Sequence, residues 1–187
     1  CVPGDVSPVV RETRFLIFGG DIMFEIHDYV RYGSFGLFQI VDKIQKTIKN
    51  GVVKDCYVLY GVQQVKTRIE TPVDNPGLRK VLSMEDIDSL ITKMPDIETN
   101  WIMDKKKREE EFRNALRCGD CIALVRVMKT IYAVKEEKAR NRKQLSYTDH
   151  SIFEQAQQQL LEEIAFGAQI SVEEADDYIR KKLSIEE

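Results

Sequence analysis

Apolar residues between positions 24 and 81 occur in short runs that are separated by turn signals. Residues 37–41 and 56–60 are two such runs, and Asn50-Gly51, a pair typical of two-residue hairpin turns, lies between them. Pro72 ends a third, weakly alternating run over 65–71, because proline has no N–H to donate to a sheet. This density of short strands predicts a small SH3-like or Tudor-like β-barrel rather than a sandwich.

The pattern changes to helical spacing after residue 82. Ser83 followed by Asp86 indicates a capped helix that ends near Met94. A second helix is predicted over 104–118, since Gly119 suits the position after a helix and Asp120 the cap of the next one. The third helix is predicted by an apolar stripe: Ile122, Val125, Met128, Ile131 and Tyr132. The fourth is predicted by a cap at Ser146 and a second stripe: Ile152, Phe153, Ala156, Leu160 and Ile164. A capping box of Ser171 and Glu174 predicts a last helix that ends near Leu183. We therefore predict an α+β fold in which a compact bundle of about five α-helices follows the β-barrel.

These patterns divide the chain into three segments. Residues 1–22 have no clear period and are rich in glycine and proline, so we expect an N-terminal extension. Met23 is a plausible natural start. Residues 23–81 form the predicted β-domain and residues 82–187 the predicted helical domain.

Composition favours a packed, water-soluble protein. Hydrophobic residues make up 43% of the chain, which is enough for a core. The uninterrupted apolar runs are far shorter than the roughly 20 residues that span a bilayer, and the run 15–18 is too short for a signal peptide. We expect a cytoplasmic protein without membrane contact, whose four cysteines are reduced.

Charge is segregated along the chain although the net charge is only -3. Residues 101–145 contain 13 Lys and Arg against 7 Asp and Glu, whereas residues 146–187 contain 3 against 10. A basic block in an acidic protein suggests one surface for an anionic partner.

Signals for an enzyme are missing from the sequence. It has neither a Walker-type phosphate loop nor a GxSxG motif, and neither His27 nor His150 lies near a nucleophile. Cys118 and Cys121 form a C-x-x-C, but a zinc site usually needs two further ligands. We predict a protein that is not an enzyme and that has no catalytic residues, cofactor or metal.

Asn100 and Trp101 stand where strand-like sequence gives way to helical sequence, just before Lys105, Lys106, Lys107 and Arg108. A large aromatic beside a compact positive run suits contact with a nucleic-acid backbone and a base step. The alternative is a tryptophan that fills the core beside a solvated helix face, which is the more common situation for each feature taken alone.

The stretch 66–71 is polar on one face and ends at a proline, as an edge strand would. Such a strand can pair with a strand of a partner protein. Charged residues on an edge can equally serve to prevent aggregation, so both interpretations stay open.

Several short motifs resemble the CarD/CdnL family of bacterial transcription regulators. In the β-domain they are Phe24, Asp28, Val30, Tyr32, Gly36, Tyr57-Val58-Leu59, Pro72-Val73 and Gly77-Leu78-Arg79. In the helical domain they are Asn100-Trp101, Gly119-Asp120, Leu145-Ser146, Ala156, Leu160 and Glu163-Ile164-Ala165. The β-domain is also similar to the polymerase-interacting domain of transcription-repair coupling factors.

The resemblance implies two binding surfaces. A Tudor-like β-domain would pair with the RNA polymerase β subunit through Lys46, Thr47, Lys66, Thr67, Arg68, Ile69 and Glu70. The helical domain would bind promoter DNA upstream of the transcription bubble through Asn100, Trp101, Lys105, Lys106, Lys107 and Arg108. In the family the matching tryptophan wedges into the minor groove and stabilises the open complex.

We therefore expect a monomeric, nucleoid-associated transcription regulator. The alternative is a protein-binding adaptor that uses the edge strand and does not bind DNA. Exposure of Trp101 distinguishes the two hypotheses, because a fully buried indole favours the adaptor and a protruding one favours the wedge.

Overall fold

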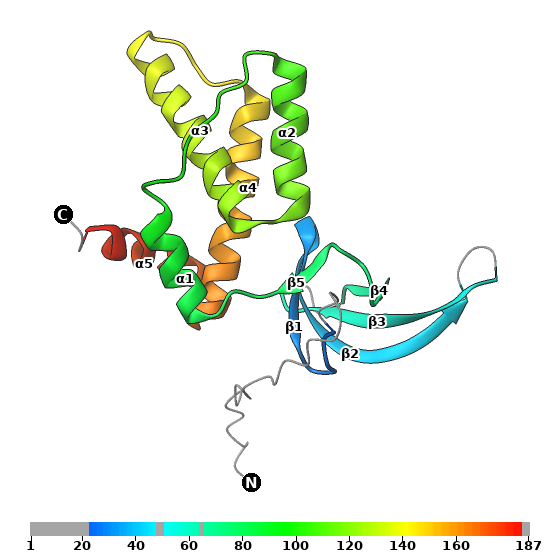
Figure 1. Cartoon of the computed structure of the whole chain (residues 1–187). Helices are drawn as coiled ribbons and strands as arrows, with labels where there is room; N and C mark the ends of the chain where they lie inside the picture. The colour runs from blue at the N-terminus through cyan, green and yellow to red at the C-terminus, as the bar shows by residue number, and fades with distance from the viewer. Residues whose placement is uncertain (1–22, 48–50, 64–65, 185–187) are drawn as a thin grey trace.

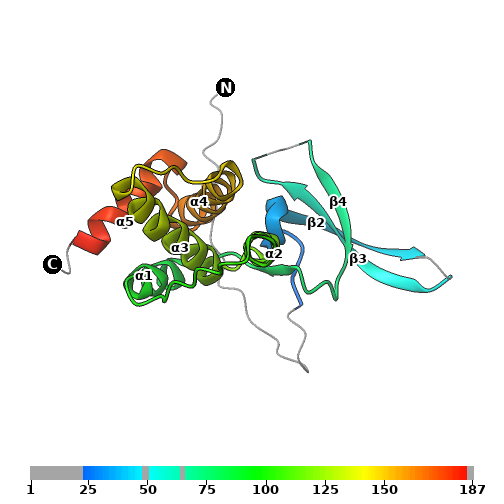
Figure 2. The same ribbon diagram turned by 90° about the horizontal axis from the view of Figure 1, so that it is seen from above.

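The computed structural model describes residues 23–47, 51–63 and 66–184, which form a β-sheet module and a helical module (Figure 1). The predicted extension, residues 1–22, lies outside the described residues. In the view from above, the two modules lie side by side, and the hairpin of β2 (Gly36–Thr47) and β3 (Val53–Gly61) extends away from the helices (Figure 2).

The sheet module is antiparallel throughout. Its strands are β1 (Tyr29–Tyr32), β2 (Gly36–Thr47), β3 (Val53–Gly61), β4 (Arg68–Pro72) and β5 (Leu78–Lys80), in the spatial order β4-β3-β2-β1-β5. A short 3-10 turn, η1 (Gly33–Phe35), connects β1 to β2. The register between β2 and β3 shifts between Ile40 and Asp42, as at a β-bulge.

The predicted α+β class is confirmed, because a five-stranded sheet precedes five helices. Closure into a barrel is not observed: within the described residues, β4 and β5 lie at opposite edges and no ladder joins them. The sheet nevertheless has its own core, formed by Val30, Phe38, Ile40, Tyr57, Leu59 and Leu78. Part of the predicted hairpin turn, Asn50, lies outside the described residues.

The helical module consists of α1 (Met84–Lys93), α2 (Lys105–Cys118), α3 (Cys121–Arg140), α4 (Tyr147–Ala168) and α5 (Val172–Ser184). The predicted caps are confirmed. Ser83 and Asp86 form a reciprocal capping box before α1, and the side chain of Asp120 accepts a hydrogen bond from the N–H of Ala123 at the start of α3. Gly119 ends α2 in the left-handed conformation with φ 65°, which glycine adopts without steric cost.

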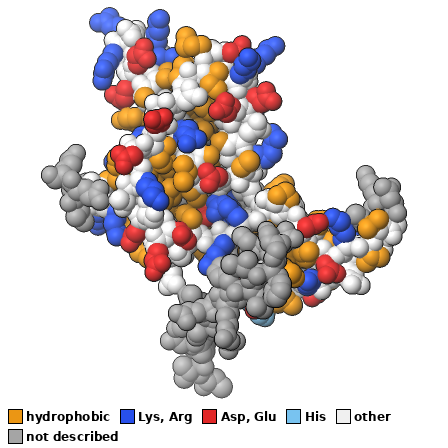
Figure 3. All heavy atoms as spheres, viewed as in Figure 1, with side chains coloured by type: hydrophobic (Ala, Val, Ile, Leu, Met, Phe, Trp, Pro, Cys, Tyr) orange, Lys and Arg blue, Asp and Glu red, His pale blue; other side chains and the backbone are white. Residues whose placement is uncertain are grey.

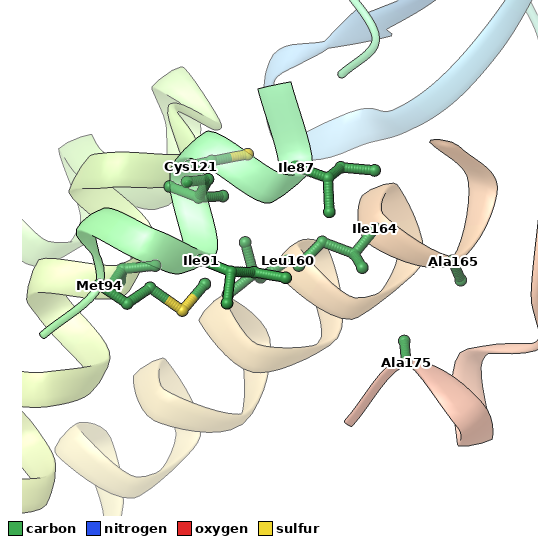
Figure 4. Close-up of a cluster of buried hydrophobic side chains, with 10 residues drawn as sticks. Ile87, Ile91, Met94, Cys121, Leu160, Ile164, Ala165 and Ala175 are labelled. Carbon is green, nitrogen blue, oxygen red and sulfur yellow. The ribbon is translucent and has the colours of Figure 1, made fainter. Parts of the chain in front are cut away.

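Two apolar clusters hold the helices together. The first joins α1, α3, α4 and α5 through ten buried residues that include Ile87, Cys121 and Ile164 (Figure 4). The second joins α2, α3 and α4 through Phe112, Leu116, Leu124, Val127, Ile131, Ile152 and Ala156, with Trp101 packed against it. Phe112 and Leu116 of α2 belong to this second cluster, so it holds the middle and the end of α2 against α3 and α4.

The described residues contain neither a candidate membrane span nor a candidate metal site. None of the helices there is long and apolar enough to span a membrane. No three His, Cys, Asp or Glu side chains in this part of the chain lie close enough together to hold a metal ion.

Candidate nucleic-acid interface and protein-binding edge

Trp101 lies on the connection between α1 and α2, and this connection is anchored to α3. The backbone N–H of Asn100 donates to Oγ1 of Thr130 at 3.2 Å, and this hydroxyl donates to the carbonyl of Arg126 at 2.7 Å. The indole is partly buried against the second cluster, with its ring centroid 6.4 Å from that of Phe112. Trp101 is therefore neither sealed in the interior nor fully protruding, and its position is defined by the fold.

Arg108 differs from the three lysines that precede it. Only 6% of the residue is exposed, and its guanidinium carbon lies 4.0 Å from the centroid of the Trp101 ring. Its Nη1 donates to the carbonyl of Ile102 at 2.9 Å, while Nε and Nη2 donate to the carboxylate of Asp149 at 3.3 and 3.4 Å. The sequence grouped Arg108 with the lysines as a DNA contact, which stays a prediction; in the structure its guanidinium supports the indole.

Asp149 is itself fixed at the start of α4. It accepts a hydrogen bond from the hydroxyl of Ser146 at 2.6 Å, and its N–H donates to the same oxygen at 3.1 Å. The side chain of Asp149 is 1% exposed, so its ion pair with Arg108 is shielded from water. A continuous set of contacts thus joins the Trp101 loop, α2 and α4, a link that was not predicted.

Lys105, Lys106 and Lys107 form the exposed first turn of α2. Asp104 caps this helix by accepting a hydrogen bond from the N–H of Lys107 at 2.9 Å. Lys105 also lies 3.7 Å from Glu109 on the next turn, a weak exposed pair. The turn therefore offers three cations, and the partial positive charge of a helix N-terminus adds to them.

A second group of cations lies at the same end of the bundle. Lys138 and Arg140 are in the last turn of α3, and Arg142 and Lys143 follow in the connection to α4. Figure 3 shows Lys and Arg side chains on both sides of this end, with acidic side chains among them. The charge count of the sequence included these residues, but the predicted binding set did not, since they lie 37 to 42 positions after Trp101 in the chain.

β4 is an edge of the sheet, as the sequence predicted, and within the described residues it pairs only with β3. The N–H of Gly61 donates to the carbonyl of Thr67, and the N–H of Val73 to that of Asp55. Because bonding alternates along an antiparallel ladder, the backbone N–H groups of Arg68 and Glu70 point to the open side. Pro72 occupies the next position whose backbone nitrogen points to the open side, where it has no N–H to offer.

The charged side chains beside this edge are paired with one another. Glu70 accepts from Nζ of Lys46 at 2.7 Å and lies 2.7 Å from Nη2 of Arg68. The hydrogen bond from Lys46 is the main reason that the pKa of Glu70 is lowered from its usual value. Lys66 and Thr47 are exposed, whereas Ile69 packs against the core of the sheet. The predicted polymerase-binding residues therefore gather on and next to one edge, with Thr47 and Lys46 on the neighbouring hairpin.

Buried ion pairs connect the sheet to the bundle. Arg79 of β5 donates from Nη1 and Nη2 to the two carboxylate oxygens of Glu163 on α4, at 2.5 and 2.6 Å. Arg31 of β1 lies 4.0 Å from the same carboxylate and donates to the side chain of Gln159 at 3.0 Å. The side chains of Arg31 and Glu163 are completely buried, so a change in the angle between the modules would leave charges unpaired. We call these residues the module joint.

A close backbone contact and a buried thiol lie beside the module joint. A Cβ atom added to Gly119 would lie 2.9 Å from the carbonyl oxygen of Gly33 in η1, so both segments need glycine. Sγ of Cys121 donates to Glu163 at 3.4 Å, and burial, assisted by that carboxylate, raises the pKa of Cys121 to about 12. The thiol is therefore held in its neutral form.

The fold and these surfaces define a two-module protein with one edge suited to a protein strand and one end suited to an anionic partner. Residues 87–180, half of the chain, match the model of the CarD C-terminal domain. The chain therefore belongs to the CarD family and is a CarD-like transcription regulator. Among curated proteins, none matches this chain.

Proposed function

We propose that this protein binds the RNA polymerase β subunit through β4 and stabilises the promoter open complex through Trp101. The observation that carries the proposal is the partly buried indole, held by Arg108 beside the exposed turn of three lysines. Asn100 is exposed beside it and its side chain is available for a groove contact. A fixed apolar group next to cations is the combination that minor-groove wedges use.

In this proposal the lysines supply DNA affinity that does not depend on the DNA sequence. Lys105, Lys106 and Lys107 would neutralise phosphates and release counterions, so binding weakens as salt rises. Trp101 would then oppose the closure of a distorted base step at the upstream edge of the bubble. The two contributions are separable, because one is electrostatic and the other apolar.

The edge strand supplies the tether. A strand of the β subunit would accept hydrogen bonds from the outward N–H groups of Arg68 and Glu70, and Lys46, Thr47, Lys66 and Thr67 would contact its side chains. Tethering raises the local concentration of the helical module at the promoter. Stabilising the open complex then requires only that the protein binds this state better than the closed one. We expect it to act as a monomer on the nucleoid.

The test is the lifetime of open complexes formed with RNA polymerase, measured after addition of a competitor. Trp101→Ala is expected to shorten the lifetime by on the order of tenfold, since losing about 1.4 kcal/mol of apolar contact corresponds to that factor. Trp101→Phe keeps a smaller aromatic ring, so its open-complex lifetime should lie between those of Trp101→Ala and the unmodified protein. Polymerase binding should be unchanged in both variants, and a lifetime equal to that of the unmodified protein would refute the wedge.

The adaptor is the second candidate, and the contact of Trp101 with Phe112 favours it, because a packed indole can be purely structural. An adaptor would bind polymerase equally well with and without promoter DNA. The proposed regulator should bind more tightly to the polymerase–promoter complex than to polymerase alone, in proportion to its DNA contacts.

A further inference from the structure

Met103, two residues after Trp101, is a large apolar side chain that is 85% exposed. A single exposed apolar residue is common on protein surfaces and by itself indicates nothing. Met103, however, is held on both sides. The preceding carbonyl, of Ile102, accepts the hydrogen bond from Arg108, and the following residue, Asp104, caps α2. Its side chain therefore extends from a fixed backbone rather than from a loose loop.

Contacts within the protein cover part of the Trp101 indole. Arg108 covers one face of the indole at 4.0 Å, and the ring packs against the cluster that contains Phe112. The indole can therefore present only part of its surface to a ligand. A larger apolar contact with a ligand than this part of the indole can make needs a second apolar side chain. Met103 is two residues away in the same anchored segment.

The neighbouring charges define what Met103 would meet. Lys105, Lys106 and Lys107 follow it on the exposed first turn of α2, where phosphates would bind. An apolar group between a phosphate-binding turn and an indole would face sugars and bases rather than phosphates. Methionine is unbranched and polarisable, so it adapts to an irregular apolar surface, and it occurs among the side chains that wedge between base steps.

We propose that Met103 is a second apolar element of the wedge, which contacts the bases or sugars of the distorted step next to Trp101. This inference rests on the proposed function, because it requires that the end of the bundle with Trp101 binds promoter DNA. It adds a DNA-contacting residue whose contribution depends on its apolar character and not on its charge.

The test compares Met103→Gln, which keeps the length of the side chain but makes it polar, with Met103→Leu, which keeps it apolar. Met84→Gln is the matched control, because Met84 is exposed at the start of α1 in a different part of the bundle. Open-complex lifetime is expected to fall about two- to fivefold in Met103→Gln, because the polar side chain makes a poorer apolar contact. It should stay close to that of the unmodified protein in Met103→Leu and in Met84→Gln.

Trp101→Ala, measured in the same series, separates the inference about Met103 from the proposed function. If Trp101→Ala shortens the lifetime and Met103→Gln does not, the inference about Met103 is wrong and the proposed function stands. If neither variant changes the lifetime, the proposed function fails and the inference fails with it.

A second readout does not depend on lifetime. An aliphatic amino acid with a photoreactive diazirine, placed at position 103 or at position 84, reports direct proximity to DNA. Crosslinks to DNA from position 103 in polymerase–promoter complexes, with none from position 84, would support the contact. An equally low yield of crosslinks to DNA from positions 103 and 84 would overturn the proposed contact.

Discussion

Arg108 is the residue whose role changes most between sequence and structure. It ends a run of four basic residues, yet its guanidinium stacks on Trp101 and pairs with Asp149 inside the protein. A planar guanidinium can do both at once, which a lysine ammonium cannot. The sequence did contain a signal for this: Arg108, Phe112 and Leu116 are spaced by four residues and so share one helix face.

This difference leads to opposite expectations for neighbouring substitutions. Arg108→Lys should lower the free energy of unfolding by about 2 kcal/mol, since it breaks a buried, hydrogen-bonded pair with Asp149. It should also shift the fluorescence of Trp101, the only tryptophan, because the planar guanidinium no longer covers one face of the ring. Chemical denaturation followed by tryptophan emission measures both effects.

Lys106→Ala is the matched contrast, because Lys106 is exposed on the same turn. Its stability should remain within about 0.5 kcal/mol of the unmodified protein. The salt dependence of DNA affinity should instead become shallower, by about 0.9 in the logarithmic slope for each phosphate that the variant no longer neutralises. If Arg108→Lys changed only the salt slope and not the stability, the supporting role of Arg108 would be wrong.

At the scale of elements, β4 illustrates which features a sequence can predict. Pro72 and the polar face of 66–71 predicted an edge strand, and β4 is one. Four helix starts were predicted as well, because Ser83, Asp120, Ser146 and Ser171 combine a local hydrogen-bonding side chain with a change of hydrophobic period. These signals lie within a few residues of the feature that they determine.

The backbone of β4 gives the sharpest test of strand pairing. Glu70→Pro removes an N–H that points to the open side, whereas Glu70→Ala removes only the side chain. If a strand of polymerase pairs with β4, Glu70→Pro should weaken polymerase binding by about fivefold more than Glu70→Ala, since one backbone hydrogen bond is worth about 1 kcal/mol. Calorimetric titration with the isolated β-subunit domain measures the difference. Equal affinities would show that the side chain, and not the backbone, makes the contact.

Features set by distant parts of the chain were not predictable from local pattern. The open sheet order β4-β3-β2-β1-β5 depends on where β5, a strand of only three residues, finds its partner. The ion pair between Arg108 and Asp149 joins residues 41 positions apart. A sequence shows that each residue is charged, but not which opposite charge the fold brings to it.

For the whole molecule, the module joint is the feature that fixes the edge strand β4 relative to the end of the bundle that carries Trp101. Glu163 is completely buried and accepts from Arg79, while Arg31 lies beside it. Under the proposed function, a fixed angle between the sheet and the bundle would hold polymerase at β4 and DNA at Trp101 at a set distance. Little ordering cost then remains when the second partner binds.

Opening of the joint can be detected through Cys121. Thiol reagents attack the thiolate, and with a pKa of about 12 only about one Cys121 in 10⁴ is ionised at pH 8. Because the folded pKa is raised, the stability that the neutral thiol contributes is complete below about pH 9 and is lost as the pH rises toward 12. Glu163→Gln, measured with Cys1 and Cys118 replaced by serine, should make Cys121 reactive at pH 8, both because the joint opens and because loss of the Glu163 carboxylate lowers the pKa of the thiol.

Cys56 provides the internal control, since it is buried in the sheet module. If the joint opens while the modules stay folded, Cys121 should react at least about tenfold faster than Cys56 in Glu163→Gln, because local opening costs less than global unfolding. The variant should bind polymerase normally and yet lose much of the effect on open-complex lifetime. Equal reactivity of the two thiols would indicate global unfolding and would contradict a separate role for the joint.

The central claim is that Trp101 keeps a base step open at the upstream edge of the bubble. A promoter with 2-aminopurine at this edge tests it most directly, because the fluorescence of this base rises when it unstacks. Adding the protein to the polymerase–promoter complex should raise the signal, and the same amount of Trp101→Ala, bound equally well to polymerase, should not. An equal rise with both proteins would contradict the claim.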